Sequence, residues 1–116
     1  MPERRTVVFL SHADEEALRL AGSCALAAAA MGDQVDVYLF GPSVRAVVDA
    51  HGELPGEPGR RLHEAREAGR CRLVACSESV VRAKVPLEEA ERALDAVVGW
   101  PTILEWSRGV VERFFF

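Results

Sequence analysis

The chain has few cysteines, and none of them form a pair at metal-binding spacing. Its 116 residues include three, Cys24, Cys71 and Cys76, with no Cys-x-x-Cys motif. An odd number without such a motif argues against a disulfide framework and against a four-ligand zinc site. His51 and His63 have no second ligand at metal spacing. The sequence therefore predicts no bound metal.

Long apolar runs are also missing. Residues 25–31 are apolar, but the run is short and belongs to an amphipathic pattern, so no stretch is suited to span a bilayer. Residues 1–5 lead directly into a strand-like run and do not resemble a signal peptide. We therefore expect a cytoplasmic protein without a membrane partner.

No cluster of basic residues is present. Fourteen Lys and Arg against eighteen Asp and Glu give a net charge of −4, and the basic residues are scattered along the chain. Nucleic-acid binding requires a basic stripe or patch, so we expect no nucleic-acid partner.

The first predicted turn is not rich in the Ser, Thr and Gly residues that bind a phosphate through free backbone N–H groups. Residues 11–16 place Asp14, Glu15 and Glu16 there instead, and three carboxylates would repel a phosphate group. This argues against flavin and nucleotide cofactors, and we expect no cofactor.

What the sequence does contain is a regular alternation of strand-like and helix-like segments. Hydrophobic residues make up 49% and charged residues 28%, typical of globular proteins, and the length suits one compact domain over residues 1–116. Short apolar runs predict strands, and segments with helical periodicity lie between them. Such alternation implies right-handed crossovers and a parallel sheet. We expect an α/β fold, a flavodoxin-like three-layer sandwich with a mostly parallel sheet of four or five strands. The predicted strands are 6–10, 34–40, 71–75, 97–100 and 110–116, and a Gly- and Pro-rich loop is predicted over 51–59.

Cys76 is the most informative residue. It ends the apolar run that starts at Cys71 and precedes the segment 77–83, so it is predicted to lie on a strand-to-helix turn. At the carboxyl ends of parallel strands such turns form the binding crevice, and a helix N-terminus favours thiolate over thiol. Cys76 is therefore a candidate reactive thiol; the alternative is that it is a small buried apolar residue.

The order of these segments resembles the DsrE/DsrF-like family of small sulfur-relay proteins. The similarity covers nearly the whole chain. It depends on the opening strand and turn and on four later segments: residues 27–32, 35–40, 68–76 and 99–102. The resemblance implies a flavodoxin-like fold, assembly as a dimer, trimer or hexamer, and a sulfur-carrying cysteine after the third strand. Only Cys76 matches that position.

The other candidate residues have weaker support. If the strand order is flavodoxin-like, the first and third strands are neighbours. His12, after the first strand, would then share a crevice with Cys76, where its imidazolium could stabilise the thiolate. The alternative is a surface histidine with no role. Cys24 lies among Ala and Leu and is expected in the core, and Cys71 is predicted on the opposite strand face from Cys76.

The chain ends with three phenylalanines, Phe114, Phe115 and Phe116. Alternate side chains on a strand point to opposite faces, so these three are all buried only if helices cover both faces. An exposed aromatic residue would instead mark a subunit contact. We expect burial assisted by homo-oligomerisation.

Two function classes follow from these observations. The first is a persulfide carrier, a possible sulfurtransferase-like protein in which Cys76 accepts sulfur from a donor protein and passes it to an acceptor protein. The second is a non-catalytic oligomeric binding module in which Cys76 is merely buried. A small-ligand or redox sensor that uses the same thiol is a further alternative.

Overall fold

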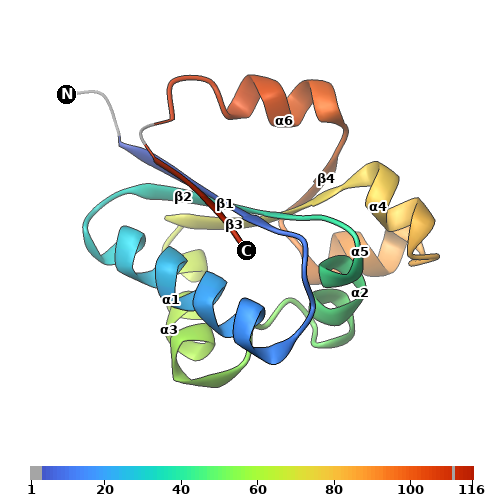
Figure 1. Ribbon diagram of the computed structural model, residues 1–116, viewed down its shortest axis with the longest axis horizontal. Coiled ribbons are helices and arrows are strands. Elements are labelled where there is room, and N and C mark those ends of the chain that lie inside the picture. Colours follow the sequence, from blue (N-terminus) through green and yellow to red (C-terminus); the bar gives the residue numbers. More distant parts are fainter. Residues whose placement is uncertain (1–3, 111) are drawn as a thin grey trace.

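A five-stranded parallel sheet forms the centre of the molecule (Figure 1). The structure is a computed structural model and describes residues 4–110 and 112–116. The strand order is β4-β3-β2-β1-β5, and every neighbouring pair is parallel. The strands are β1 (Arg5–Leu10), β2 (Gln34–Leu39), β3 (Cys71–Cys76), β4 (Ala96–Val98) and β5 (Glu112–Phe115).

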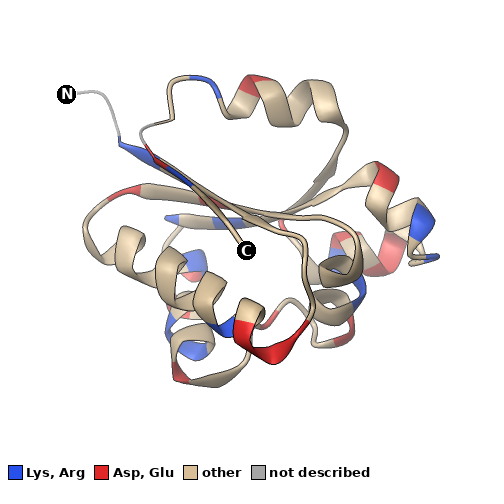
Figure 2. Ribbon diagram, in the orientation of Figure 1, with Lys and Arg blue, Asp and Glu red and all other residues tan. Residues whose placement is uncertain are grey.

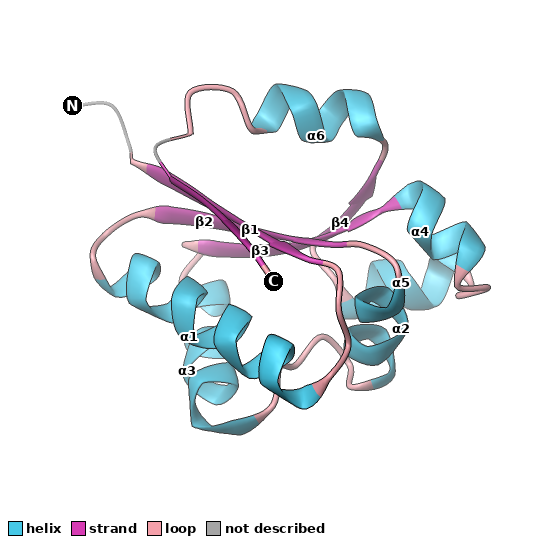
Figure 3. Cartoon of the chain, viewed as in Figure 1, coloured by secondary structure: helices cyan, strands magenta, loops and turns pink. Residues whose placement is uncertain are grey.

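In the described part of the chain, six helices connect these strands and lie in two layers of unequal size. Figure 3 shows α6 alone on one side of the sheet and the remaining helices on the other side or at its end. The helices are α1 (Glu15–Ala30), α2 (Pro42–Asp49), α3 (Gly56–Glu67), α4 (Ser77–Arg82), α5 (Leu87–Ala93) and α6 (Trp100–Trp106).

The handedness of the crossovers explains this unequal layering. From β1 to β4, each strand is added beside the previous one, always on the same side. Right-handed connections made in the same direction place all their helices on one face of the sheet. The last connection runs back across the whole sheet from β4 to β5, beside β1, and therefore crosses the opposite face. α6 belongs to that returning connection.

Each face of the sheet has its own apolar cluster. The larger cluster lies under α1, α2 and α3 and includes Leu39, Leu62 and Cys71. The smaller one lies under α6 and consists of Val7, Tyr38, Val74, Cys76 and Ile103. Because side chains alternate along a strand, Cys71 and Cys76 contribute to different clusters.

The predicted fold class is confirmed: the chain is a three-layer α/β protein with five parallel strands. The strand order corrects one expectation, because β2 lies between β1 and β3. The first and third strands are therefore not neighbours. The predicted loop over 51–59 was too long, since α3 already begins at Gly56.

Asp14 and Gly32 lie at the two ends of α1. Asp14 is the N-cap, and its carboxylate accepts a hydrogen bond of 3.1 Å from the backbone N–H of Ala17. Gly32 follows the helix with a φ of +91°, a backbone conformation that glycine adopts without strain.

The C-terminal aromatic residues are only partly buried within one chain. β5 is an edge strand, and Phe114 and Phe115 are 39% and 72% exposed. Of the three, only Phe116 packs partly against the larger cluster. The expected burial assisted by homo-oligomerisation stays a prediction.

Charged residues of both signs are distributed over the described part of the chain, as Figure 2 shows. No helix among residues 4–110 and 112–116 has the length and apolar character needed to cross a membrane.

Candidate functional site

Cys76 occupies the junction between β3 and α4. It is the last residue of the strand and the N-cap of the helix, with an extended backbone at φ −72° and ψ 125°. The strand-to-helix turn predicted from the sequence is therefore present. α4 has only six residues, so its dipole is short.

The strand order gives this junction the topology at which open α/β sheets bind ligands. The chain leaves β3 toward α4, on the side of the larger helix layer, whereas it leaves β4 toward α6, on the opposite side. In open α/β sheets, ligands bind where connections from neighbouring strands diverge in this way. Cys76 pairs with Val98 at the carboxyl ends of these two strands.

Gly99 and Trp100 begin the connection that leaves β4, directly after Val98, the residue that pairs with Cys76. A Cβ added to Gly99 would lie 3.7 Å from the Ser77 hydroxyl oxygen, so the two turns are in close contact. Trp100 is 46% exposed. Residues 99–102 carried part of the family resemblance, but sequence reasoning did not place them beside Cys76, because that required the strand order.

A row of stacked aromatic rings runs from this position to the far edge of the sheet. Its centroid distances are 5.2 Å for Trp100 and Phe40, 5.9 Å for Phe40 and Phe9, and 4.9 Å for Phe9 and Phe115. Phe9 and Phe40 also pack against the cluster that contains Cys76. The rings keep this face of the sheet apolar up to β5.

The Cys76 side chain is closed off from solvent in this structure. The residue is 2% exposed and packs in the cluster with Val7, Tyr38, Val74 and Ile103. Cys76 lies where open α/β sheets bind ligands, as a reactive thiol would. It is also as buried as an apolar core residue. Both readings of Cys76 made from the sequence therefore find support.

The two other cysteines are poorly suited to react. All three cysteines are free in this structure. Burial raises the pKa of the Cys71 thiol to about 12, and burial also raises the pKa of Cys24. Thiolate, the attacking form, is therefore scarce at both positions near neutral pH.

His12 is not brought beside Cys76 by strand adjacency. With β2 between them, β1 and β3 are two strand spacings apart, about 10 Å. His12 is exposed, and its Nδ1 lies 3.4 Å from the hydroxyl oxygen of its neighbour Ser11. The shared crevice assumed for the first and third strands is therefore absent, and a role for His12 stays a prediction.

A buried ion-pair network lies on the Cys76 face, nearer the amino ends of the strands. The Asp36 carboxylate is 1% exposed and accepts hydrogen bonds from Arg5 at 2.6 Å and from Arg72 at 2.8 and 2.9 Å. The Arg72 guanidinium also lies 4.2 Å from the centre of the Trp106 ring. Burial, with the nearby Asp36 charge, raises the pKa of Tyr38 to about 12. The network connects the sheet to the end of α6.

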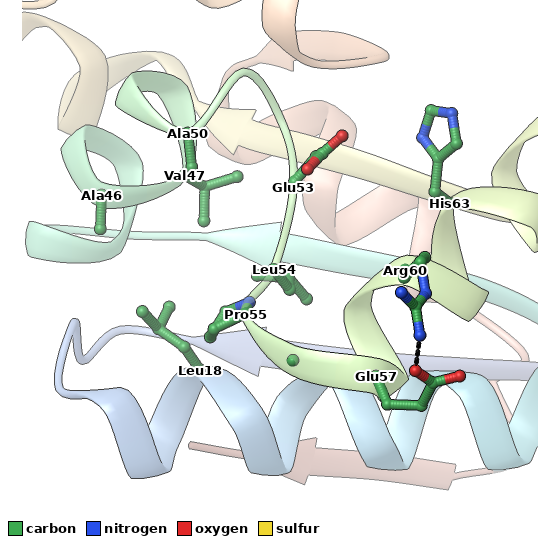
Figure 4. A pocket seen from close by; sticks show the side chains of 11 residues that line it. Leu18, Ala46, Val47, Ala50, Glu53, Leu54, Pro55, Glu57, Arg60 and His63 are labelled. Atoms are coloured by element: carbon green, nitrogen blue, oxygen red, sulfur yellow. Dashed lines mark ion pairs between the residues drawn. The ribbon is translucent and has the colours of Figure 1, made fainter.

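A surface hollow of about 820 Å³ lies elsewhere, between α1, α2 and α3 (Figure 4). Leu18, Val47 and Leu54 form its apolar part, and the charged side chains Glu57 and Arg60 pair with each other. No cysteine lines it. Among the described residues, no three His, Cys, Asp or Glu side chains are grouped to hold a metal ion.

The chain belongs to the DsrE/DsrF-like family. The model of that family matches residues 5–108, which include the strand β3, the Cys76 junction and α6. No curated protein matches the chain.

Solved structures share the fold at low sequence identity. The YchN protein from E. coli superimposes with a TM-score of 0.70 at 16% identity, covering 97% of this chain and 99% of the other. A protein of unknown function from Methanobacterium thermoautotrophicum gives 0.70 at 19% identity, covering 96% and 99%. A conserved protein of unknown function from Bacteroides thetaiotaomicron gives 0.69 at 13%, covering 97% and 94%. These similarities establish the fold.

Proposed function

We propose that the protein is a persulfide carrier in which Cys76 holds the transferred sulfur. The single observation that carries the proposal is the position of Cys76 at the carboxyl end of β3, where the connections from β3 and β4 diverge. Membership of a family associated with sulfur relay supports the same reading. The two remaining cysteines have pKa values raised by burial, which leaves Cys76 as the carrier.

The proposed transfer requires no metal and no change in oxidation state overall. The Cys76 thiolate attacks the terminal sulfur of a donor persulfide, R–S–SH. A new S–S bond forms at Cys76, the donor S–S bond breaks, and the donor leaves as the thiolate R–S⁻. An acceptor nucleophile then attacks the terminal sulfur on Cys76, takes it, and releases the Cys76 thiolate.

Donor and acceptor proteins are the partners that this chemistry requires, and a cytoplasmic location is part of the proposal. We also propose a homo-oligomer, with a dimer or trimer as plausible as a hexamer. The exposed Phe115 on edge strand β5 supports association, because an unpaired strand edge with exposed aromatic residues readily pairs with another chain.

A second candidate function is supported by the burial of Cys76. A residue that is 2% exposed can be a packing residue only, and the protein would then be a non-catalytic oligomeric module. The alternatives differ in one measurable property, the ability of Cys76 to accept sulfur. A redox or ligand sensor would use the thiol without passing sulfur on.

Incubation with a persulfide donor, followed by intact mass analysis, tests the proposal. Wild type should gain 32 mass units, the mass of one sulfur atom by elementary chemistry. Cys76→Ser should gain none. Cys24→Ala and Cys71→Ala are the matched controls and should load like wild type. Loading of Cys76→Ser at the wild-type level would refute the assignment.

His12 requires a separate variant. If its imidazole assists Cys76, His12→Ala should slow loading without changing the final amount of bound sulfur. Loading of His12→Ala at the wild-type rate would remove His12 from the proposal.

A further inference from the structure

We propose that α6 is a lid that moves away from the sheet to expose Cys76. This inference rests on the proposed function, because a sulfur carrier must bring its thiol into contact with a donor. The closed arrangement leaves Cys76 2% exposed, and α6 is the helix that covers its face of the sheet (Figure 1).

The attachment of α6 to the sheet is small. Ile103 is its one fully buried side chain, in the cluster that contains Cys76. Leu104 is 59% exposed and Trp100 46%. Trp106 is the other α6 side chain that packs against this cluster, and it is only partly buried. The larger helix layer, in contrast, buries many side chains from α1, α2 and α3.

A gap already separates part of α6 from the sheet. A hollow of about 470 Å³ lies between them, lined by Phe9 and Phe115 on the sheet side and by Ile103, Leu104 and Ser107 on the helix side. Side chains of α6 therefore fill only part of the space over β1 and β5. A helix packed over an incomplete interface separates from it more easily than a fully packed one.

Two polar features at the C-terminal end of α6 suit a reversible closure. Arg72 holds Trp106 by a cation–π contact, and Arg113 donates a hydrogen bond of 3.1 Å to the Ser107 carbonyl oxygen. When α6 moves away from the sheet, both of these contacts can be exchanged for contacts with water.

The segments that flank α6 permit such a movement. β4 is only three residues long, all of them half-buried, and it joins α6 through Gly99. Gly109 follows the helix with a φ of +72°. Glycine tolerates the changes in backbone angle that a hinge needs.

Cys71 provides an internal control for the test. It lies on the same strand and is also 2% exposed, but it is covered by the larger helix layer. Alkylation with iodoacetamide, followed by peptide mass mapping, measures both thiols in one sample. If α6 opens locally, the rate at Cys76 should change little with low urea. The rate at Cys71 should rise steeply, because its exposure needs global unfolding.

Matched variants on the two faces sharpen the test. Ile103→Ala weakens the packing of α6 on the sheet and should accelerate labelling of Cys76 by about tenfold or more, relative to any change at Cys71. Leu62→Ala weakens the packing of the opposite helix layer and should not accelerate labelling of Cys76 relative to that of Cys71. If Ile103→Ala does not fold, Ile103→Val should accelerate labelling of Cys76, relative to Cys71, by roughly twofold or more. The urea dependence of labelling is measured on wild type and needs no variant.

Three results would contradict the lid. The labelling rates of Cys71 and Cys76 could depend equally on urea, or the Ile103 variant could accelerate labelling of both cysteines equally. The third is labelling of wild-type Cys76 as fast as that of a free cysteine. Iodoacetamide contains no transferable sulfur, so its rates report access alone. Failure of the lid is thereby distinguished from failure of the carrier function, which is measured by persulfide loading.

Discussion

Cys71 and Cys76 begin and end the same strand, yet they pack into different apolar clusters. Cys71 points into the larger cluster, where burial raises its pKa to about 12. Cys76 points into the smaller cluster at the junction with α4. The alternation of side chains along a strand accounts for this difference. Five residues of separation place the two sulfurs on different faces.

Because the pKa of Cys71 is raised, the free energy of unfolding should depend on pH in the alkaline range. Unfolding returns its pKa from about 12 to an ordinary value near 9. Below pH 9 the thiol is protonated in both states, and its stabilising effect is complete. As pH rises from 9 to 12, the unfolded thiol ionises first and stability falls.

Urea unfolding of wild type and Cys71→Ala measures this effect. Between pH 8 and 10.5, the free energy of unfolding of wild type should fall by about 2 kcal/mol more than that of the variant. The difference grows by about 1.4 kcal/mol per pH unit above 9. Tyr38 also has a pKa near 12, but it is present in both proteins and cancels in the comparison. Equal losses in the two proteins would contradict the raised pKa of Cys71.

At the scale of elements, the loop before α3 shows how closely the larger helix layer packs. Leu54 in this loop is 6% exposed and faces two glycines, Gly22 of α1 and Gly59 of α3. A Cβ on Gly59 would overlap the Leu54 carbonyl oxygen, whereas a Cβ on Gly22 would lie 3.5 Å from the Leu54 Cδ1 atom. Backbone cannot move aside as a flexible side chain can.

We therefore expect Gly59→Ala to be strongly destabilising. Overlap with backbone should cost about 2 kcal/mol or more in unfolding free energy. Gly22→Ala is the matched control, because it adds the same methyl group beside the same leucine. It should be neutral or stabilise by up to about 1 kcal/mol, since alanine is the better helix former. Chemical denaturation measures both, and equal effects would contradict the packing described.

For the whole molecule, the exposed aromatic edge has the clearest consequence. Phe115 is 72% exposed at the end of the stacked row, on a strand with an unpaired edge. Light scattering at micromolar concentration should give the mass of a homo-oligomer. A monomer mass for wild type would contradict the expected assembly.

Substitution of Phe115 tests which surface associates. Phe115→Ser should shift the mass toward the monomer, because it removes apolar area at the edge strand. Met31→Ser is the control, since Met31 is 74% exposed but follows the end of α1. If both variants keep the wild-type mass, the contact lies on a different surface.

The sequence by itself determined the elements and their class. Continuous apolar runs predicted strands, helical periodicity predicted helices, and their alternation predicted a parallel sheet with helices on both faces. These signals are local, so they can be read within a short window. The same locality placed Cys76 on a strand-to-helix turn and Cys71 on the opposite face.

Only the tertiary structure decided which elements are neighbours and which side chains are covered. Strand order depends on packing across the whole sheet, so it could not be derived from local patterns, and the adjacency assumed for His12 was wrong. The same order brought Gly99 and Trp100 beside Cys76 and left Phe115 exposed at an edge. Burial of Cys76 beneath α6 likewise arises because one long connection returns across the sheet, a contact between distant segments that no local pattern specifies.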